Sequence, residues 1–587
     1  MRITSIIIFL CTSQVSLLGQ FRHYDFIGAG HSNEVTVTTS SSTENISGER
    51  TVDGFDISNE DQLKDASRFL AHCTFGADMA TIQMTAAMGY ESWLDEQFEL
   101  PLIPLTPVMK QLSALEEDEN EGEEILFFFP YMEKAWMNNN LTAPDLLRHR
   151  LAFIWSQIMV INTNSDLFED HGQLSSTFYD MLSQNAFENY RQLIQDVTYH
   201  PAMGLFLSHY NNPKEDPANN IHPDENYARE VMQLFSIGLW ELDQYGNRKY
   251  DNNGQFIPTY SNAQIKEFAQ VFTGLGNGSE DGVFGPSADD GFESISTLPM
   301  KMYDDYHDTS EKHLLNGLVL SANQTGDLDI SQTLDHLSSH ANTAPFIVKS
   351  LIRFLTTSNP SGPYIQRVAS VFNPSKEGNF KDVIRAILLD PEARNCNPTA
   401  TYTFGKLREP FLRRMNYLKA FPMSVNELGH FGTDTKCIGN TLGQSPLNAP
   451  SVFNFFLPEY SPQGPINQQY LVGPEFQILN STNSIGLVND VNLMAVERNY
   501  LGECIEGDGE EDDLNFMSQL DFSAEQAVAM DSDLLLQRLD ILLANGLLSL
   551  DTKTIIKTAI DQLDDPEDRI KMAMYLIMIS PDYSILK

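Results

Sequence analysis

The chain has 587 residues, of which 42% are hydrophobic, so it is long enough and apolar enough to bury a large core. Its 80 acidic side chains outnumber its 37 basic ones and give a formal net charge of −43. A surface of that sign repels nucleic acid and anionic membranes, so nucleic acid is not an expected partner.

The first 19 residues have the pattern of a secretory signal. Arg2 supplies a positive charge, the run Ile6 to Cys11 is apolar, and small residues lie between Ser16 and Gly19. The apolar run is too short to span a bilayer, and no later run reaches the roughly eighteen residues that a spanning helix needs. We therefore expect signal cleavage near Gly19 and a secreted or periplasmic protein with no transmembrane segment in the mature chain.

The rest of the chain divides by composition. Residues 20–60 are rich in Ser, Thr, Gly and Asn, which predicts a flexible segment. From residue 61 onward, apolar residues recur at helical spacing. We predict a mainly α-helical fold, with one large multi-helix domain and long loops over residues 61–587, in which residues 505–587 could form a C-terminal helical subdomain. A short alternating segment, 248–251, lies between two Gly turns and predicts a small β-hairpin.

The stretch from 200 to 240 contains the densest polar chemistry of the chain, at the start of a predicted helix. Pro223 suits the first position of a helix, because its missing N–H costs nothing there. Asp224 and Glu225 follow, where carboxylates face the free N–H groups and the positive end of the helix dipole. Arg229 lies one turn after Glu225, so these two side chains can pair.

Glu230 lies at the border of the apolar stripe of the same helix, which comprises Tyr227, Val231 and Leu234. A carboxylate at such a border needs a partner, because burying an unpaired charge is costly. Two interpretations stay open. The helix is either a capped structural element with an ion pair and a hydrogen-bonded Glu230, or the base of a functional site.

A second polar cluster lies further along, within the segment YHDTSEKHLLNG. With the central helix, it could form a carboxylate–histidine site for acid–base chemistry or for a hard metal. We expect His307 and Lys312 to be the partners of Glu230. The candidate catalytic residues are Glu225, Glu230, His307 and Lys312. The candidate binding residues are Asp224, Asn226, Arg229 and Asp308.

The identity of any metal stays open. The carboxylates and the negative field favour a hard divalent cation, calcium or magnesium. His336 and His340 have the i, i+4 spacing of zinc ligands, but the glutamate expected beside the first His is absent, so a structural role is favoured over zinc.

Two further features have structural interpretations. Arg408 and Glu409 precede Pro410 at a helix start, where an ion pair or a cap is favoured over catalysis. After signal removal four cysteines remain, without a zinc-binding spacing, and their disulfide pairing stays open. They are Cys73, Cys396, Cys437 and Cys504.

Several motifs, in this order, resemble those of one bacterial family. They include LTAPDLLRHRLAFIWSQIMVI, HPDENYAREVMQLFSIGLWEL, YHDTSEKHLLNG, FGKLREP and LGQSPLNAPSVFNFFLPEYSPQGP. From about residue 61 to the C-terminus, the chain resembles the domain-of-unknown-function 1800 family. The resemblance implies an α-rich exported protein and brings no established activity. Members are often encoded beside exported proteins that resemble the sulfatase and alkaline-phosphatase fold, which indicates work on an extracellular or envelope polymer.

The chain departs from the family pattern at two places. Many members have histidines directly after the tryptophan of the first motif, whereas this chain reads Trp155-Ser156-Gln157-Ile158. Many also have an aspartate at the position of Ser208. If those groups serve a metal or catalysis in other members, this chain lacks part of the set, which weakens the case for an enzyme.

Two classes of function therefore remain. The first is a hydrolase-like exported enzyme that acts on envelope or extracellular polymer, with a polysaccharide as partner. The second is a non-catalytic binding or assembly partner of another exported protein. An enzyme predicts that the candidate side chains converge in one concave pocket. A binding protein predicts an exposed apolar or aromatic patch, with those charges paired off.

Overall fold

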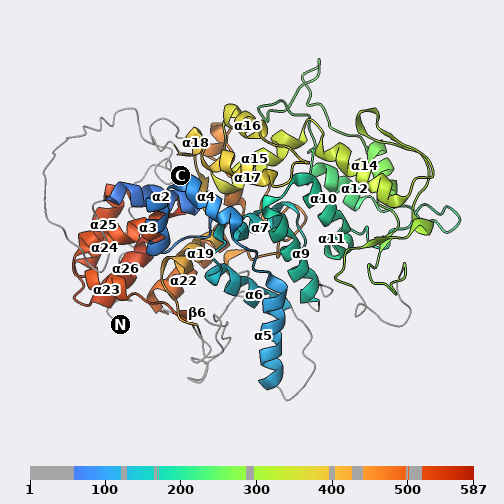
Figure 1. Ribbon diagram of the computed structural model, residues 1–587. Coiled ribbons are helices and arrows are strands. Elements are labelled where there is room, and N and C mark those ends of the chain that lie inside the picture. Colours follow the sequence, from blue (N-terminus) through green and yellow to red (C-terminus); the bar gives the residue numbers. More distant parts are fainter. Residues whose placement is uncertain are drawn as a thin grey trace.

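The computed structural model describes residues 59–119, 129–163, 168, 171–285, 296–394, 403–425, 441–497, 500–501 and 518–587. Within these residues helices dominate, as predicted, and strands form short antiparallel pairs (Figure 1). None of the helices described is both long and apolar enough to cross a membrane. The predicted signal, nearly all of the predicted flexible segment and the last three cysteines lie outside the described residues, while Cys73 is free and buried.

The first and last helices of the described chain pack together at one end of the molecule (Figure 1). Ser67 donates a hydrogen bond to the Ile541 carbonyl at 2.5 Å, and Asn545 donates to the Ser67 hydroxyl at 2.8 Å. The predicted boundary of a C-terminal subdomain at residue 505 falls outside the described residues. The helices of this end are α2 (Glu60–Cys73), α3 (Met79–Met88), α4 (Tyr90–Glu99), α23 (Ser523–Val528), α24 (Ser532–Leu539), α25 (Leu550–Ile560), α26 (Pro566–Met578) and α27 (Pro581–Ser584).

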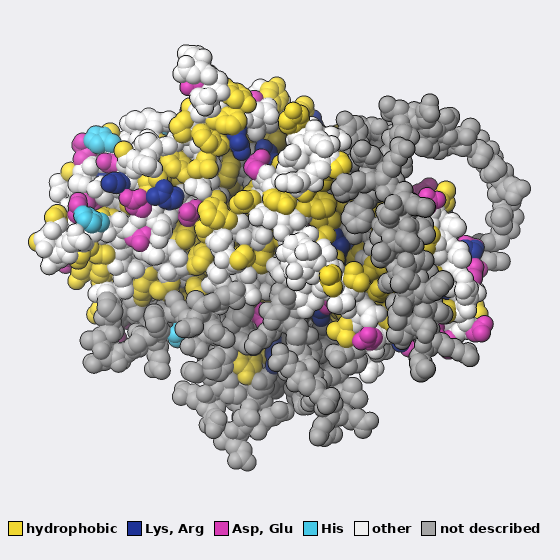
Figure 2. Space-filling model, turned by 180° about the vertical axis from the view of Figure 1, so that it is seen from behind, with side chains coloured by type: hydrophobic (Ala, Val, Ile, Leu, Met, Phe, Trp, Pro, Cys, Tyr) yellow, Lys and Arg dark blue, Asp and Glu magenta, His cyan; other side chains and the backbone are white. Residues whose placement is uncertain are grey.

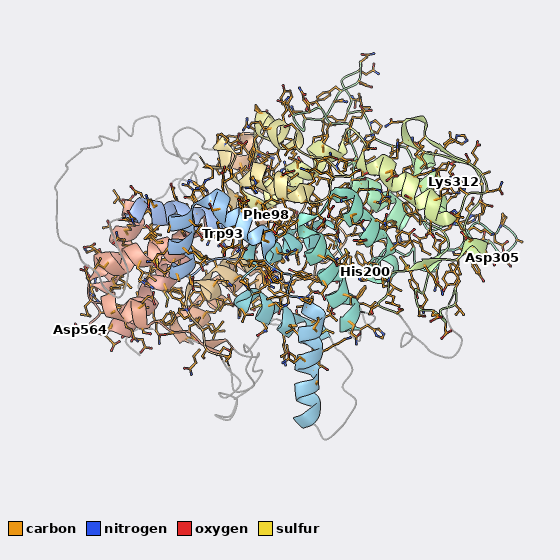
Figure 3. The ribbon with its side chains drawn as sticks, viewed as in Figure 1. Trp93, Phe98, His200, Asp305, Lys312 and Asp564 are labelled. Atoms are coloured by element: carbon orange, nitrogen blue, oxygen red, sulfur yellow. The ribbon has the colours of Figure 1, made fainter. Side chains whose placement is uncertain are left out.

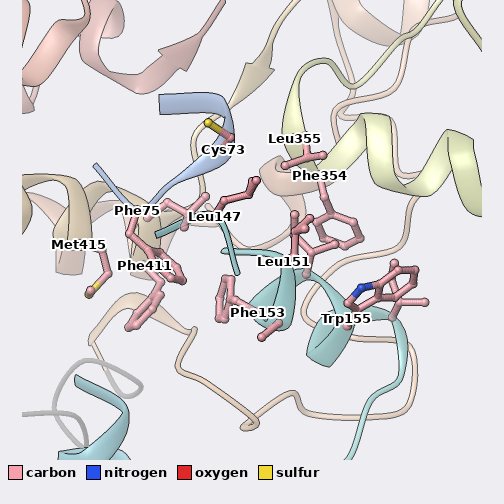
Figure 4. Close-up of a cluster of buried hydrophobic side chains, with 14 of the residues drawn as sticks. Cys73, Phe75, Leu147, Leu151, Phe153, Trp155, Phe354, Leu355, Phe411 and Met415 are labelled. Atoms are coloured by element: carbon pink, nitrogen blue, oxygen red, sulfur yellow. The ribbon is translucent and has the colours of Figure 1, made fainter. Parts of the chain in front are cut away.

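Helix α7 (Leu146–Ile158) lies at the centre and is buried from Leu147 to its last residue. Its apolar side chains contact several other elements, and Figure 4 shows Leu151, Phe153 and Trp155 within this cluster. A helix buried on all sides must find internal partners for its polar groups. Arg150 accordingly donates to the Phe354 carbonyl at 3.0 Å.

Other helices surround α7 and connect the two ends. They are α5 (Leu105–Glu119), α6 (Phe129–Thr142), α9 (Gly172–Gln184), α15 (Thr343–Leu355), α16 (Gly362–Ala369), α17 (Asn379–Leu388), α18 (Pro391–Arg394), α19 (Pro410–Ala420), α21 (Pro465–Gln468) and α22 (Ser481–Asn492). The helices of the second end are α10 (Tyr190–Tyr199), α11 (Pro201–Phe206), α12 (Asn226–Gln233), α13 (Asn262–Val271) and α14 (Gly326–Ser338). The buried apolar side chains of all these layers form one continuous core.

The strands are short and antiparallel. The pairs are β1 (Leu275–Gly276) with β2 (Lys301–Met302), β3 (Lys312–His313) with β4 (Val319–Leu320), β5 (Lys406–Leu407) with β8 (Ile585–Leu586), and β6 (Tyr500–Leu501) with β7 (Ser518–Gln519). The β5–β8 pair joins segments far apart in the sequence, so it ties the C-terminus to the centre.

The predicted hairpin is confirmed and is larger than expected. Leu242 pairs with Arg248, and Tyr250 pairs with Phe256, so the segment 248–251 has a partner on both sides. Backbone hydrogen bonds extend this arrangement from residue 239 to residue 259. We call residues 239–259 the meander. It leads directly into α13, whose N-terminus has a capping box formed by Ser261 and Gln264.

Candidate functional site

Asp329 is the centre of a buried ionic cluster in the second end of the molecule. Lys312 Nζ lies 2.8 Å from Asp329 Oδ2, and His307 Nε2 lies 3.2 Å from the same oxygen. The Gln324 amide donates to the other oxygen, Oδ1, at 2.6 Å. His307 and Lys312 are 0% exposed and Asp329 is 1% exposed. Figure 3 shows Lys312 near α14, far from Asp564 at the opposite end.

The remaining hydrogen-bonding groups of His307 and Lys312 also face oxygen atoms. Lys312 Nζ donates to the carbonyls of Asp308 at 2.6 Å and Ser310 at 3.1 Å. The Nδ1 atom of His307 lies 2.9 Å from the Thr273 carbonyl oxygen. The ammonium group therefore faces three acceptors, and both ring nitrogens of the histidine face oxygen atoms. The cluster is satisfied within itself, and the predicted binding residue Asp308 is part of it.

The electrostatics of Asp329 follow from this arrangement. Burial raises the pKa of its carboxyl group, but the hydrogen bonds from His307, Lys312 and Gln324 and the charge of Lys312 outweigh burial and bring the pKa below the usual range. Asp329 is therefore a permanently charged anchor at neutral pH. The sequence analysis did not identify Asp329 as a partner of Lys312, because Asp329 lies 17 residues after Lys312, in the first turn of α14.

A β-hairpin positions Lys312. Strands β3 and β4 are joined by a turn in which Asn316 and Gly317 have φ values of 54° and 78°. An Asn-Gly pair with positive φ at both positions suits the twist of a tight hairpin. The sequence LLNGLVL contains this signal, which could have predicted the second hairpin.

Glu230 is isolated from this cluster. It is 8% exposed, and its Oε2 atom is buried without a hydrogen-bond partner among the described residues. The prediction that His307 or Lys312 would pair with Glu230 is wrong, because both side chains contact Asp329 instead. Burial raises the pKa of Glu230, an effect that the charge of Arg229 reduces. Burial and the charge of Glu230 also raise the pKa of the neighbouring Tyr260 to about 12.

The other candidate residues form the start of α12. The helix begins at Asn226 and not at Pro223, because Asp224 folds back and accepts the Asn226 N–H at 2.8 Å. The predicted ion pair of Glu225 with Arg229 is present at 3.1 Å and is more than one third exposed. The candidate residues therefore divide into a capped helix start, an unpaired Glu230 and a separate buried cluster.

A second buried ionic cluster lies around β5 at the centre. Lys406 Nζ is 3.0 Å from a Glu475 oxygen and 3.5 Å from a Glu409 oxygen. Gln444 and Gln157 each donate to Glu409, at 2.7 and 3.2 Å. Burial raises the pKa of Glu475, the Lys406 charge opposes that rise, and the nearby Glu409 adds to it. The ion pair expected between Glu409 and its neighbour Arg408 is not the one present, because Glu409 pairs with Lys406.

The neighbouring Arg408 has different partners. It donates to the side chains of Asn545 at 2.6 Å and Asn416 at 3.0 Å. Gln157 of α7 supplies an amide to the buried cluster around Glu409. The amide adds a hydrogen bond here without adding a titratable group.

No group of three or more His, Cys, Asp and Glu side chains is placed to hold a metal ion in the described part of the chain. His336 and His340 have ring centroids 6.4 Å apart, and His340 Nδ1 accepts the Asn342 N–H at 3.1 Å. Burial lowers the pKa of both histidines. Calcium or magnesium binding stays a prediction, since the arrangement identifies no ligand set for it.

Two surface hollows lie away from the candidate catalytic residues. One has a volume of about 650 Å³ and lies between the meander, the start of α15 and the end of α16. The other, of about 470 Å³, lies between α16 and α17. Neither is lined by Glu225, Glu230, His307 or Lys312.

Fold and site together define a mainly α-helical protein. Its candidate catalytic residues His307 and Lys312 lie in a buried ionic cluster around Asp329. The family described as "Protein of unknown function (DUF1800)" matches residues 68–585, nearly the whole chain, so this chain belongs to that family. No curated protein and no solved structure matches it.

Replacing Asp329 tests whether the buried cluster is structural. Asp329→Ala leaves Lys312 and His307 buried without their carboxylate and should lower the free energy of unfolding by about 3–5 kcal/mol. The double variant Lys312→Met with Asp329→Leu should recover much of that loss, because it removes the unpaired charge. Urea unfolding followed by circular dichroism measures both.

The matched control is Asp335→Ala on the same helix. Asp335 is 65% exposed and pairs with Arg191, so its loss should cost less than about 1 kcal/mol. An Asp329→Ala variant as stable as this control would contradict a structural role for the cluster.

The unpaired Glu230 predicts a pH-dependent stability. Because its pKa is raised in the folded state, the folded protein binds this proton more tightly than the unfolded chain does. That contribution is present in acid and is lost as the pH rises from the ordinary glutamate range through the raised pKa. Glu230→Gln should therefore be more stable than the parent at about pH 8, by about 1 kcal/mol, and equally stable at about pH 4.

Thermal melts at the two pH values measure this difference. Glu225→Gln is the control, since removal of a largely exposed ion pair should change stability by less than about 0.5 kcal/mol. A Glu230→Gln variant that is less stable than the parent at the higher pH would show that Glu230 has a stabilising partner.

Proposed function

We propose that the protein is an exported, non-catalytic binding or assembly protein whose partner is another exported protein. The observation that supports this most is the burial of the candidate catalytic residues His307 and Lys312. His307 and Lys312 are fully buried and face acceptors on every side, so neither has a free group to offer a substrate. The N-terminal signal pattern supports export.

The surface supports a binding role. The meander and the loop 451–472 meet at Glu459, which lies 2.8 Å from Arg353 of α15 and 3.9 Å from Arg248 of the meander. Large apolar side chains of these two segments are exposed to solvent. They are Leu239, Tyr250, Phe453, Leu457 and Tyr470.

Two of these side chains are suited to anchor a partner. Tyr470 is 96% exposed and Tyr250 is 63% exposed. The Tyr250 ring lies 4.9 Å from Phe256, which Arg248 covers at 5.0 Å, so Tyr250 extends from an ordered aromatic group. Tyrosine and arginine are enriched at protein interfaces. Figure 2 shows hydrophobic side chains gathered across the upper middle of one face of the molecule. Such surfaces are typical of interaction sites.

The alternative, a hydrolase acting on envelope or extracellular polymer, retains one favourable observation. Glu230 is a mostly buried carboxylate with a raised pKa, which is the property that a general acid requires. An enzyme of this kind would lose activity in Glu230→Gln while keeping its fold.

Capture of partners tests the binding role. Tagged full-length protein is incubated with the exported fraction of the producing cells, and the bound proteins are quantified. The double variant Tyr250→Ser with Tyr470→Ser should reduce capture of its specific partner by about tenfold, which corresponds to about 1.4 kcal/mol of binding energy. The control is Leu550→Ser, because Leu550 is 83% exposed but lies on α25 at the other end of the molecule.

Equal capture by the parent, the double tyrosine variant and Leu550→Ser would contradict a binding role for Tyr250 and Tyr470. Loss of a polymer-degrading activity in Glu230→Gln, with capture unchanged in the double tyrosine variant, would favour the enzyme instead.

A further inference from the structure

The hollow between the meander and α16 has the construction of a binding groove. Its volume of about 650 Å³ is in the range of small-molecule sites. Three segments separated in sequence form it: the meander, the start of α15 and the end of α16. Its lining comprises Leu242, Asp243, Gln244, Tyr245, Lys249, Ala341, Ala344, Pro345, Gln366, Ala369 and Ser370.

The walls of the groove are fixed to one another. Asn342 donates to the carbonyls of Ile237 and Trp240 at 2.9 and 2.8 Å and accepts the Leu242 N–H at 2.9 Å, which attaches the meander to the start of α15. On the other side Tyr245 packs so closely on Gly362 that a methyl group there would lie 2.9 Å from the Tyr245 Cβ. The shape is therefore present before any ligand binds, which reduces the entropic cost of binding.

The charged groups of the lining already have partners. Asp243 Oδ1 accepts the backbone N–H groups of Tyr245 and Asn247 at 2.8 and 2.9 Å, and Oδ2 accepts the Asn247 amide at 3.2 Å. Lys249 Nζ lies 3.4 Å from Glu241. The lining therefore contains one carboxylate, Asp243, and one ammonium group, Lys249, so it has no net charge with which to select an ionic ligand.

The neutral polar groups are free. The amides of Gln244 and Gln366 and the hydroxyl of Tyr245 form no hydrogen bond to the described residues. Amides and hydroxyls both donate and accept, so they match a ligand whose own groups do the same. Between them lies a floor of small apolar side chains: Ala341, Ala344, Pro345 and Ala369. Small side chains allow a ligand ring to approach the backbone closely.

From these observations we infer that the groove binds a neutral glycan. Sugar rings combine hydroxyls, which donate and accept, with apolar C–H faces, which fit the aromatic ring of Tyr245 and the alanine–proline floor. The formal net charge of −43 disfavours an acidic polymer, and the ammonium group of Lys249 in the lining disfavours a cationic one. The groove lining includes neither Tyr250 nor Tyr470, so this inference does not depend on the protein-binding role proposed for those two side chains.

Affinity electrophoresis of the full-length protein tests the inference. The gels contain one neutral polysaccharide each, a glucan, a mannan or a galactan, or an acidic polymer, a polygalacturonate. At least one neutral polysaccharide should retard the protein. Gln366→Ala and Tyr245→Ala should each weaken that retardation by about tenfold, whereas Gln526→Ala, an exposed control on α23, should not.

The inference is overturned if no neutral gel retards the protein, or if only the polygalacturonate gel does. It is also overturned if Gln366→Ala and Tyr245→Ala leave the retardation unchanged. If those two variants instead lose capture of an exported protein and no glycan is bound, the groove is a protein contact. Circular dichroism of each variant verifies that its fold is intact. The capture experiment with the tyrosine double variant is scored separately, so failure of one proposal leaves the other testable.

Discussion

The structure depends on one physical constraint: charged side chains inside a continuous apolar core must each find an opposite charge or a set of hydrogen bonds. An unpaired charge in such surroundings costs several kcal/mol, on the order of the whole stability of a domain. Lys312 with Asp329, and Lys406 with Glu475, satisfy this requirement with partners from other structural elements. The first contact holds α14 against β3 in the second end of the molecule, and the other holds β5 at the centre.

The same constraint changes the interpretation of the polar motifs. A histidine, a lysine and several carboxylates close together in sequence are typical of a catalytic site, and YHDTSEKH has that composition. In the folded chain the histidine and the lysine are directed inward to Asp329, while Glu230 lies apart from them without a partner. The exposed Tyr250 and Tyr470 and the neutral amides beside the meander are among the described groups that remain free to meet a ligand. Recognition therefore fits the arrangement better than catalysis does.

Local features could be predicted from the sequence, because they depend on residues within one or two turns of each other. The helical character, the capping box of Ser261 and Gln264, the Glu225–Arg229 pair and the hairpin around 248–251 are of this kind. The partner of His307 and Lys312 could not be predicted from the sequence. Asp329 lies on a separate element, α14, and it is one of 80 acidic residues that could take this role. The start of α12 also differed from prediction, because the side chain of Asp224 folds back to the Asn226 N–H group and Asp224 stays outside the helix.

The central claim is that His307 and Lys312 are buried structural residues that solvent does not reach. Labelling of lysines with an amine-acetylating reagent, with the products located by mass spectrometry, tests this claim most directly. Lys312 is 0% exposed, whereas the side chain of Lys376 is 54% exposed, although both are ion-paired. The account predicts that Lys376 reacts in the native protein and that Lys312 reacts only after unfolding in urea. Acetylation of native Lys312 at a rate similar to that of Lys376 would contradict it, because the lysine would then be open to solvent and available to a substrate.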